Sequence, residues 1–228
     1  MTLPMRLRPT SVFASYIVGP NDEIVRYVER LAPDARPLVT YLYGPIGVGK
    51  THLLQAICAQ AGTQNRPAAY LPLRELQSVP QAIDGCEMLA FVCLDDVDLV
   101  IGNAEWERAL FRLHTLIDDQ PGRLVLSGTL PPAHLKFKLA DLGSRLAAGT
   151  ILRLRPLSDE QQSRALTMRA HQLGLELPDD VAQFLHRHLP RDMGSLCAAL
   201  DRLDQASLAS QRRLTLPFVR ATLADAQR

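Results

Sequence analysis

Gly44-Pro45-Ile46-Gly47-Val48-Gly49-Lys50-Thr51 matches G-x-x-x-x-G-K-[ST], the pattern of a phosphate-binding P-loop, at every position. The glycines of this stretch have no Cβ, so the backbone can turn tightly and direct successive N–H groups at a phosphate. Lys50 supplies a positive charge for the β- and γ-phosphates, and the Thr51 hydroxyl can ligate Mg²⁺. The helix expected over residues 50–61 directs the positive end of its dipole at the same anion. The stretch therefore predicts a nucleotide site with Mg²⁺.

The flanks of this stretch favour the same interpretation. Residues 38–43 form a short, β-prone apolar run that leads directly into the loop. After the loop, Leu53, Leu54, Ile57 and Cys58 recur at helical spacing. Strand, loop and helix in this order are the context that the motif requires, whereas the alternative, a chance glycine-rich turn, does not predict both flanks.

Short apolar segments bounded by Gly, Pro or polar residues continue along the first part of the chain. Between the segments 88–94 and 123–127 lies a helix in which four apolar residues share one face, namely Trp106, Leu110, Leu113 and Ile117. Strands that alternate with helices in this way indicate an α/β fold, a parallel sheet covered by helices on both faces. The strand-like segments after the P-loop helix are residues 68–73, 88–94, 123–127 and 150–154.

The pattern changes at Pro156, after which no further strand is evident and three or four helices are expected. Residues 158–161 (Ser-Asp-Glu-Gln) predict a capping box that opens a helix ending near Gly174. We expect an N-terminal segment, an α/β domain and a small helical domain. Later helix starts are predicted at Pro178, Asp192 and Pro217, and the expected domains are residues 1–9, 10–157 and 158–228.

Composition narrows the class of protein. The 228 residues are 47% hydrophobic, enough to bury a core, and no apolar run approaches a membrane span or a signal peptide. We therefore expect a soluble, cytoplasmic protein without a membrane partner. A net charge of +1 argues against a general nucleic-acid coat, so any DNA contact is expected to be weak or made through a partner. The four cysteines are scattered, which disfavours a zinc site.

Acidic residues follow the apolar run that ends at Leu94. An acidic residue at the tip of a buried parallel strand is where P-loop enzymes hold Mg²⁺, and we assign this role to Asp95. Asp96 is placed to orient or deprotonate an attacking water. The alternative is that both carboxylates end a strand in solvent, and it stays open for Asp96.

Two further positions are weaker candidates on the residues alone. Ser127-Gly128-Thr129 ends the next strand, where hydroxyls could sense a γ-phosphate, although these are also ordinary turn residues. Arg145 lies on a predicted short helix before the last strand. An Arg there could stabilise charge on a neighbouring subunit's γ-phosphate, but a surface Arg is the simpler interpretation from the residues alone.

Taken together, these segments resemble the AAA+ family, within it the clade of the bacterial replication initiator DnaA, and most closely the Hda group of DnaA regulators. The resemblance runs nearly from end to end and is much more specific than the P-loop alone. Its phrases are residues 10–16 with Gly19 and Asn21, then 70–73, 105–107, 142–146, 156–160, 176–181, 200–204 and 213–219.

The resemblance implies a P-loop sheet in the order 5-1-4-3-2 followed by a helical lid domain. It implies adenine held between the Tyr16 to Asn21 segment and the lid, and Arg145 at the arginine-finger position, acting in trans. By this resemblance, the chain is expected to end where DnaA would continue into its DNA-binding domain. The nucleotide-binding residues so implied are Gly44, Pro45, Gly47, Val48, Gly49, Lys50, Thr51, His52, Tyr16, Val18, Asn21, Thr129 and Arg191, with Thr51 and Asp95 for Mg²⁺.

The partners implied by the resemblance are DnaA and the DNA polymerase III sliding clamp (beta subunit), with DNA reached through the clamp and a homo-oligomer possible. An ADP-bound protein (or one with ATP) would promote hydrolysis of the ATP bound to DnaA, and its own ATPase activity is expected to be weak or absent. The alternatives are an autonomous AAA+ ATPase of the loader type and a DnaA-like initiation factor that binds DNA.

Some positions depart from the family pattern. Thr129 stands where relatives usually have Asp, and Gly194 stands where the sensor-2 Arg is expected, with Arg191 almost one helical turn earlier. The N-terminal clamp-binding motif usually begins with Gln, whereas residues 2–7 read Thr-Leu-Pro-Met-Arg-Leu. These departures concern the sensors and clamp binding and leave the P-loop intact.

Overall fold

The structure is a computed structural model that describes residues 11–190 and 192–225. The chain divides into two compact units, each described by itself below. The α/β unit comprises residues up to 45 and residues 50–155, and the helical unit comprises residues 156–228 together with residues 46–49 of the P-loop.

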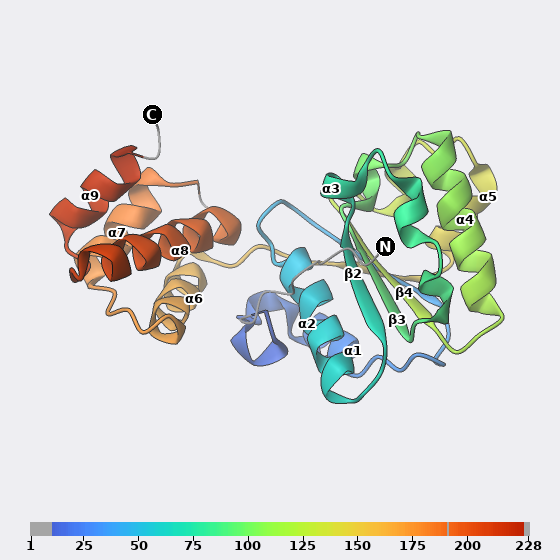
Figure 1. Cartoon of the computed structure of the whole chain (residues 1–228), viewed down its shortest axis with the longest axis horizontal. Coiled ribbons are helices and arrows are strands. Elements are labelled where there is room, and N and C mark those ends of the chain that lie inside the picture. The colour runs from blue at the N-terminus through green and yellow to red at the C-terminus, as the bar shows by residue number, and fades with distance from the viewer. Residues whose placement is uncertain (1–10, 191, 226–228) are drawn as a thin grey trace. The chain divides into compact units, whose positions relative to one another are not determined.

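A parallel sheet is the centre of the α/β unit (Figure 1). Its strands run in the order β2-β3-β4-β1-β5, which confirms the order expected from the sequence. Tyr41 in the middle of β1 pairs with Leu126 of β4 on one side and with Ile151 of β5 on the other. The strands are β1 (Val39–Tyr43), β2 (Ala68–Pro72), β3 (Phe91–Asp95), β4 (Arg123–Gly128) and β5 (Thr150–Arg153).

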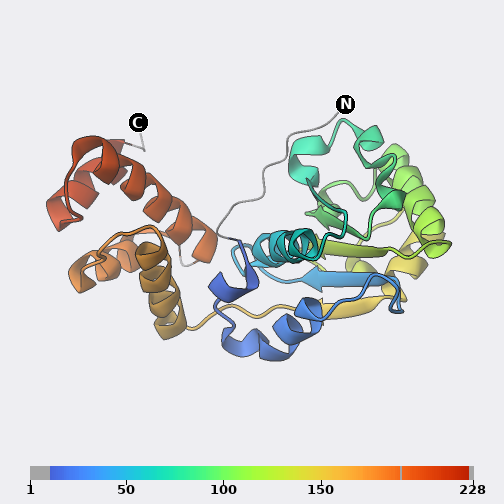
Figure 2. The same ribbon diagram turned by 60° about the horizontal axis from the view of Figure 1, so that its bottom comes forward.

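Helices cover both faces of this sheet, as expected for a buried parallel sheet (Figures 1 and 2). On one face α2, the helix that follows the P-loop, packs on β2, β3 and β4 and contacts α1. On the other face α4 contacts α5. The helices are α1 (Asp22–Glu29), α2 (Lys50–Thr63), α4 (Ala104–Asp118) and α5 (Ala140–Ala147).

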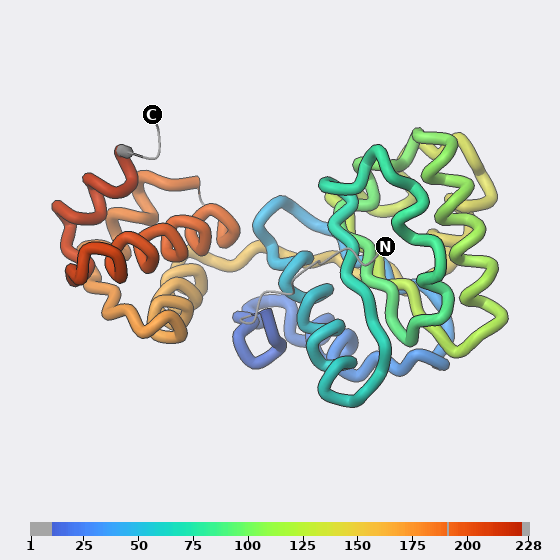
Figure 3. The backbone as a smooth tube through the Cα atoms, viewed as in Figure 1, coloured from blue at the N-terminus to red at the C-terminus, as the bar shows by residue number. Residues whose placement is uncertain are grey.

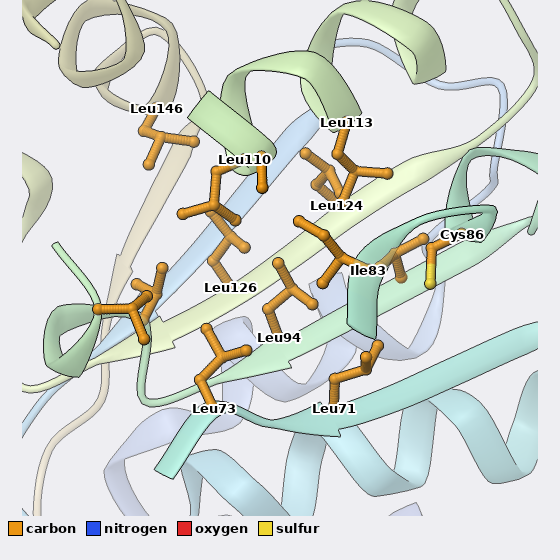
Figure 4. Close-up of a cluster of buried hydrophobic side chains, with 14 of the residues drawn as sticks. Leu71, Leu73, Ile83, Cys86, Leu94, Leu110, Leu113, Leu124, Leu126 and Leu146 are labelled. Carbon is orange, nitrogen blue, oxygen red and sulfur yellow. The ribbon is translucent and has the colours of Figure 1, made fainter. Parts of the chain in front are cut away.

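The core between the sheet and α4 is built from the residues that periodicity predicted. Leu110 and Leu113 of α4 pack towards Leu94, Leu124 and Leu126 of the central strands (Figure 4). Burial of side chains of this size contributes about 1.5–3 kcal/mol each relative to exposure. Among the fully buried residues of this cluster are Trp106 and Ile117, which share the predicted face of the helix.

The segment between β2 and β3 differs from the expectation. Residues 88–90 were expected to begin a strand, but the strand starts at Phe91, and Met88 ends a short 3-10 helix with its side chain largely exposed. Leu73 likewise starts a helix instead of continuing β2. The segment packs beside α4 (Figure 3) and contains α3 (Leu73–Leu76), η3 (Pro80–Ile83) and η4 (Cys86–Met88).

Other short 3-10 turns connect the main elements of the α/β unit. Two of them precede α1, and sequence periodicity did not predict them because a single turn has no repeat to detect. They are η1 (Phe13–Ser15) and η2 (Gly19–Asn21), and further along the chain η5 (Val97–Leu99) and η6 (Pro132–His134).

The helical unit begins with the predicted capping box. The Ser158 hydroxyl accepts from the Gln161 N–H at 3.3 Å, and the Gln161 side chain accepts from the Ser158 N–H at 2.9 Å. Asp192 caps a later helix as predicted, because its carboxylate accepts from the Ser195 N–H at 2.9 Å. The helices are α6 (Asp159–Gln172), α7 (Asp179–His188), α8 (Met193–Ser210) and α9 (Leu216–Asp225).

These helices enclose a core of their own. Leu166 of α6, Val181 and Leu185 of α7 and Leu200 of α8 are completely buried, and Val219 of α9 joins them. Within residues 11–190 and 192–225, no helix has both the length and the apolar character needed to cross a membrane.

Candidate functional site

The polar residues predicted to act on a nucleotide meet where the parallel strands end. The carboxyl ends of β1, β3 and β4 lie at the same edge of the sheet, and ligands of open α/β sheets bind outside this edge. Gly44 follows β1, Asp95 ends β3, and Ser127 lies one residue before the end of β4. The topology thus brings together three segments that are far apart in the sequence.

The P-loop has the backbone conformation that its glycines predict. Gly47 (φ +78°) and Gly49 (φ +96°) lie in the left-handed region, which side chains with a Cβ rarely adopt. The Lys50 ammonium, almost fully buried, donates to the carbonyl oxygens of Gly44 at 2.7 Å and Pro45 at 2.9 Å. Burial lowers the pKa of Lys50, and the negative charges of nearby aspartates oppose this shift.

Asp95 is the most constrained carboxylate of this edge, with 3% of its surface exposed. The Thr51 hydroxyl donates to Asp95 Oδ2 at 2.6 Å, and the Tyr70 hydroxyl donates to the same oxygen at 2.9 Å. The Ser127 hydroxyl donates to Oδ1. The residues predicted to hold Mg²⁺, Thr51 and Asp95, are therefore in direct contact.

Asp96 is not a free carboxylate. Its backbone lies in the left-handed region (φ +58°), and its N–H donates to the Ser127 hydroxyl at 3.0 Å. Its side chain accepts from Arg74 Nε at 3.2 Å. Burial raises the pKa of Asp96, the charge of Asp95 raises it further, and Arg74 opposes both. The carboxylate predicted to orient water is thus engaged by a cation of α3.

Thr129 is engaged by a carboxylate that sequence reasoning did not single out. Its N–H donates to Asp98 Oδ2 at 2.9 Å, and its hydroxyl donates to the same oxygen. Asp98 lies in η5, after β3, so a side chain from the neighbouring strand exit places an acidic group beside position 129. Relatives usually have Asp at position 129. Here the residue is Thr, and the carboxylate of Asp98 lies beside it instead.

The segment expected to contact adenine is tied to the α/β unit by side chains. The Asn21 amide donates to the Arg155 carbonyl at 2.9 Å and accepts from the Arg155 N–H at 2.8 Å, so it has a structural role. The Tyr16 ring meets the His52 ring edge-on with centroids 5.4 Å apart. Burial raises the pKa of Tyr16 to about 12. Val18 is half-buried, directly before η2.

Arg145 lies in a different environment, among residues of α4 and α5. Its guanidinium lies over the Phe111 ring at 4.6 Å, donates to His114 Nδ1 at 3.3 Å and forms an ion pair with Asp141 at 3.5 Å. About a third of its side chain is exposed. Burial lowers the pKa of His114 and the Arg145 charge lowers it further, which leaves the imidazole neutral and able to accept.

Arg191 and the possible clamp-binding segment 1–9 lie outside the described residues. Gly194 is the second residue of α8. Sequence reasoning missed Tyr70, Arg74 and Asp98, whose contacts depend on how the strands are paired. The usable signal was weak: Tyr70 is a polar aromatic residue within a predicted strand.

The residues at the sheet edge fit a nucleotide phosphate chain with Mg²⁺. Among the described residues, no group of three or more His, Cys, Asp or Glu side chains could hold a metal ion unaided. Mg²⁺ usually takes one or two protein ligands and completes its octahedron with phosphate oxygens and water. Thr51 would supply a ligand, Asp95 would orient metal-bound water, and Lys50 would contact the phosphates.

Comparison with known families divides the chain in a similar way. Residues 7–153 match the family described as the bacterial DnaA ATPase domain. Residues 159–223 match the family described as the lid domain of Hda.

Solved structures share the fold at low sequence identity. Domain III of the replication initiation protein DnaA from Thermotoga maritima has a TM-score of 0.79 and 22% identity, covering 97% of this chain and 98% of that one. AMPPCP-bound DnaA from Aquifex aeolicus has a TM-score of 0.70 and 20% identity over 86% of this chain and 65% of that one. The Holliday junction branch migration motor RuvB from T. maritima has a TM-score of 0.63 and 18% identity over 96% and 72%.

Proposed function

The chain belongs to the bacterial DnaA ATPase domain family and carries a lid domain of the Hda type, and from this premise we propose that it is a negative regulator of chromosomal replication initiation. With the DNA-loaded sliding clamp, it promotes hydrolysis of the ATP bound to DnaA. The observation that carries the proposal is the succession in one chain of a DnaA ATPase domain and an Hda lid.

The P-loop edge is proposed to hold a resident nucleotide, ADP or ATP, with Mg²⁺. Lys50 and the backbone N–H groups of the loop bind the phosphates, and Thr51 binds the metal. Mg²⁺ would neutralise part of the negative charge of the phosphates. The Arg74 contact to Asp96 supports weak hydrolysis by this chain itself, because that carboxylate is the one positioned to orient water.

Arg145 is proposed to act as an arginine finger in trans. Its contacts with Phe111, His114 and Asp141 place it among α4 and α5, whereas the P-loop leads into α2 on the opposite face of the sheet (Figure 1). A cation on this face is available to the nucleotide of a second molecule, where an arginine finger contributes about 10³–10⁵ in rate. We propose that this second molecule is DnaA.

The sliding clamp is the second proposed partner, bound through the N-terminal segment. DNA is then reached through the clamp, and the near-neutral net charge of the chain is compatible with this indirect contact.

The test is hydrolysis of ATP by DnaA on clamp-loaded DNA, measured with and without this protein. We expect stimulation by the wild type and its loss, by at least about 100-fold, in Arg145→Ala. Arg26→Ala is the matched control, since Arg26 is an exposed Arg of α1 in an ion pair with Asp22 at 2.7 Å, and it should retain full stimulation.

Either of two results would contradict the proposal. One is no stimulation by the wild type, and the other is stimulation that Arg145→Ala leaves intact. Steady ATP turnover by the purified protein alone, abolished by Lys50→Ala, would instead support an autonomous ATPase. Salt-dependent DNA binding without the clamp would support a DNA-binding initiation factor.

A further inference from the structure

Tyr70 connects the outer strand β2 to the proposed metal site. It lies in the middle of β2 and pairs with Cys93, two residues before Asp95 on β3. Residues two apart on a strand face the same side of the sheet, about 6.6 Å apart, and directly paired residues of neighbouring strands share a side as well. A tyrosine ring that leans along the strand therefore spans this gap, and its hydroxyl reaches Asp95 Oδ2 at 2.9 Å.

The acceptor positions of Asp95 show what this contact does. Each oxygen of an ionised carboxylate offers about two lone-pair positions. On Oδ2 these are used by the hydroxyls of Thr51 at 2.6 Å and Tyr70 at 2.9 Å, and Oδ1 accepts from Ser127. The carboxylate is therefore held from α2, β2 and β4, and it cannot rotate without breaking a contact; Asp95 is only 3% exposed.

The direction of the Tyr70 hydrogen bond is unambiguous. A tyrosine hydroxyl carries one proton that it can donate. Because ionised Asp95 can only accept, Tyr70 is the donor, and it leaves Oδ2 aligned on the Thr51 hydroxyl.

We propose that Tyr70 is a positioning residue of the Mg²⁺ site, which fixes the Asp95 carboxylate against Thr51 and thereby makes nucleotide binding metal-dependent. The inference rests on the proposed function only in requiring that a nucleotide and Mg²⁺ bind at this edge. It does not depend on DnaA, the clamp or Arg145. A purely structural hydroxyl that helps β2 to pack is the competing role.

The test compares the affinity of fluorescently labelled ADP in excess Mg²⁺ and in a chelator. Tyr70→Phe keeps the ring and removes only the donor. We expect its affinity in Mg²⁺ to fall about tenfold, the usual effect of one hydrogen bond to a charged group, with affinity in chelator unchanged. Tyr27→Phe is the control, because it removes a hydroxyl that donates to Thr150 at 3.0 Å, and it should change neither value.

A second measurement distinguishes positioning from packing. In an Asp95→Asn background, Tyr70→Phe should cause no further loss of the Mg²⁺ effect, because both residues act through the same oxygen. Thermal unfolding of Tyr70→Phe should match that of Tyr27→Phe.

Several results would overturn the inference. They are an equal fall in affinity with and without Mg²⁺, no fall at all, or losses that add in the double variant. Wild-type affinity that is itself indifferent to Mg²⁺ would also overturn it. In that last case stimulation of DnaA could still be observed, so the two proposals fail separately.

Discussion

Two charged regions of the α/β unit are built in opposite ways. At the sheet edge, Asp95 and Lys50 are 3% and 6% exposed. Asp95 is held by hydroxyls from α2, β2 and β4, and Lys50 by two carbonyl oxygens of the P-loop. On α5, Arg145 is a third exposed and is held by a ring face, a neutral imidazole and an i,i+4 carboxylate. Buried charges that neighbouring groups hold in place are pre-organised for a ligand that enters among them. A partly exposed cation is suited to a charge brought by another molecule.

The largest effect should come from the buried cation of the sheet edge. In Lys50→Ala the affinity for labelled ADP should fall by about 100-fold or more, because the loop loses its charge-assisted contact to the phosphates. Equilibrium titration measures this. Lys136→Ala removes an exposed lysine of the same unit and should leave the affinity unchanged. An affinity that survives Lys50→Ala would contradict the assignment of the phosphates to this loop.

The next effect concerns Glu107, which holds together the helices α4 and α5 that surround Arg145. Glu107 is 1% exposed, and its carboxylate accepts from the N–H groups of Gly102 at 2.7 Å, Lys138 at 3.1 Å and Leu139 at 2.6 Å. It thereby ties the start of α5 to α4. Glu107→Ala leaves these donors unsatisfied and should lower the free energy of unfolding by about 3 kcal/mol.

Urea denaturation measures this change. Glu105→Ala, at an exposed position of the same helix, should change the free energy of unfolding by less than about 0.5 kcal/mol. If Glu107→Ala were equally mild, the Glu107 carboxylate would not be what holds the α4–α5 region together. The affinity for ADP should be unaffected in protein that remains folded. This would show that the sheet edge and the α4–α5 region are energetically independent.

The contrast between the regions also explains what the sequence could predict. The P-loop, the alternating strands and the helix caps depend on residues close together in the chain, and the caps are confirmed. The sheet order, which the family resemblance implied, is confirmed as well. The expected start of a strand at Met88 was wrong because an apolar residue can be exposed: Met88 lies 68% open to solvent in a 3-10 turn.

Contacts across the sheet were beyond sequence reasoning. Tyr70 reaches Asp95, Arg74 reaches Asp96 and Asp98 reaches Thr129 only because of strand pairing and loop conformation. Thr129 was a weak candidate to sense a γ-phosphate, and nothing in its local pattern reveals that its hydroxyl is bound to Asp98. The role of Arg145 followed from family resemblance alone, since its surroundings are made by α4, a distant segment.

A smaller effect is expected from Arg145 on the isolated protein. Arg145→Ala should change the affinity for ADP less than twofold, because its contacts are with Phe111, His114 and Asp141 and not with the residues of the sheet edge. The same titration used for Lys50→Ala measures this. A large loss of affinity would mean that Arg145 supports the chain's own nucleotide. The contrast between buried charges that bind this chain's nucleotide and an exposed cation that acts on a partner would then fail.

The smallest effect is a pH dependence at His114. Burial and the Arg145 charge hold the pKa of His114 below its ordinary value of 6.5. Below about pH 6.5 the unfolded chain therefore binds a proton that the folded chain does not, so stability should fall as the pH decreases towards the folded pKa. Urea denaturation from pH 7.5 to 5 should show a shallower decline of the free energy of unfolding in His114→Gln than in the wild type.

Arg145→Ala removes one of the two causes of the lowered pKa of His114. It should give an intermediate slope, since burial still acts on the imidazole. Equal slopes in the wild type and Arg145→Ala would mean that Arg145 and His114 are not coupled in solution, and the guanidinium would then be held by the Phe111 ring and Asp141 alone.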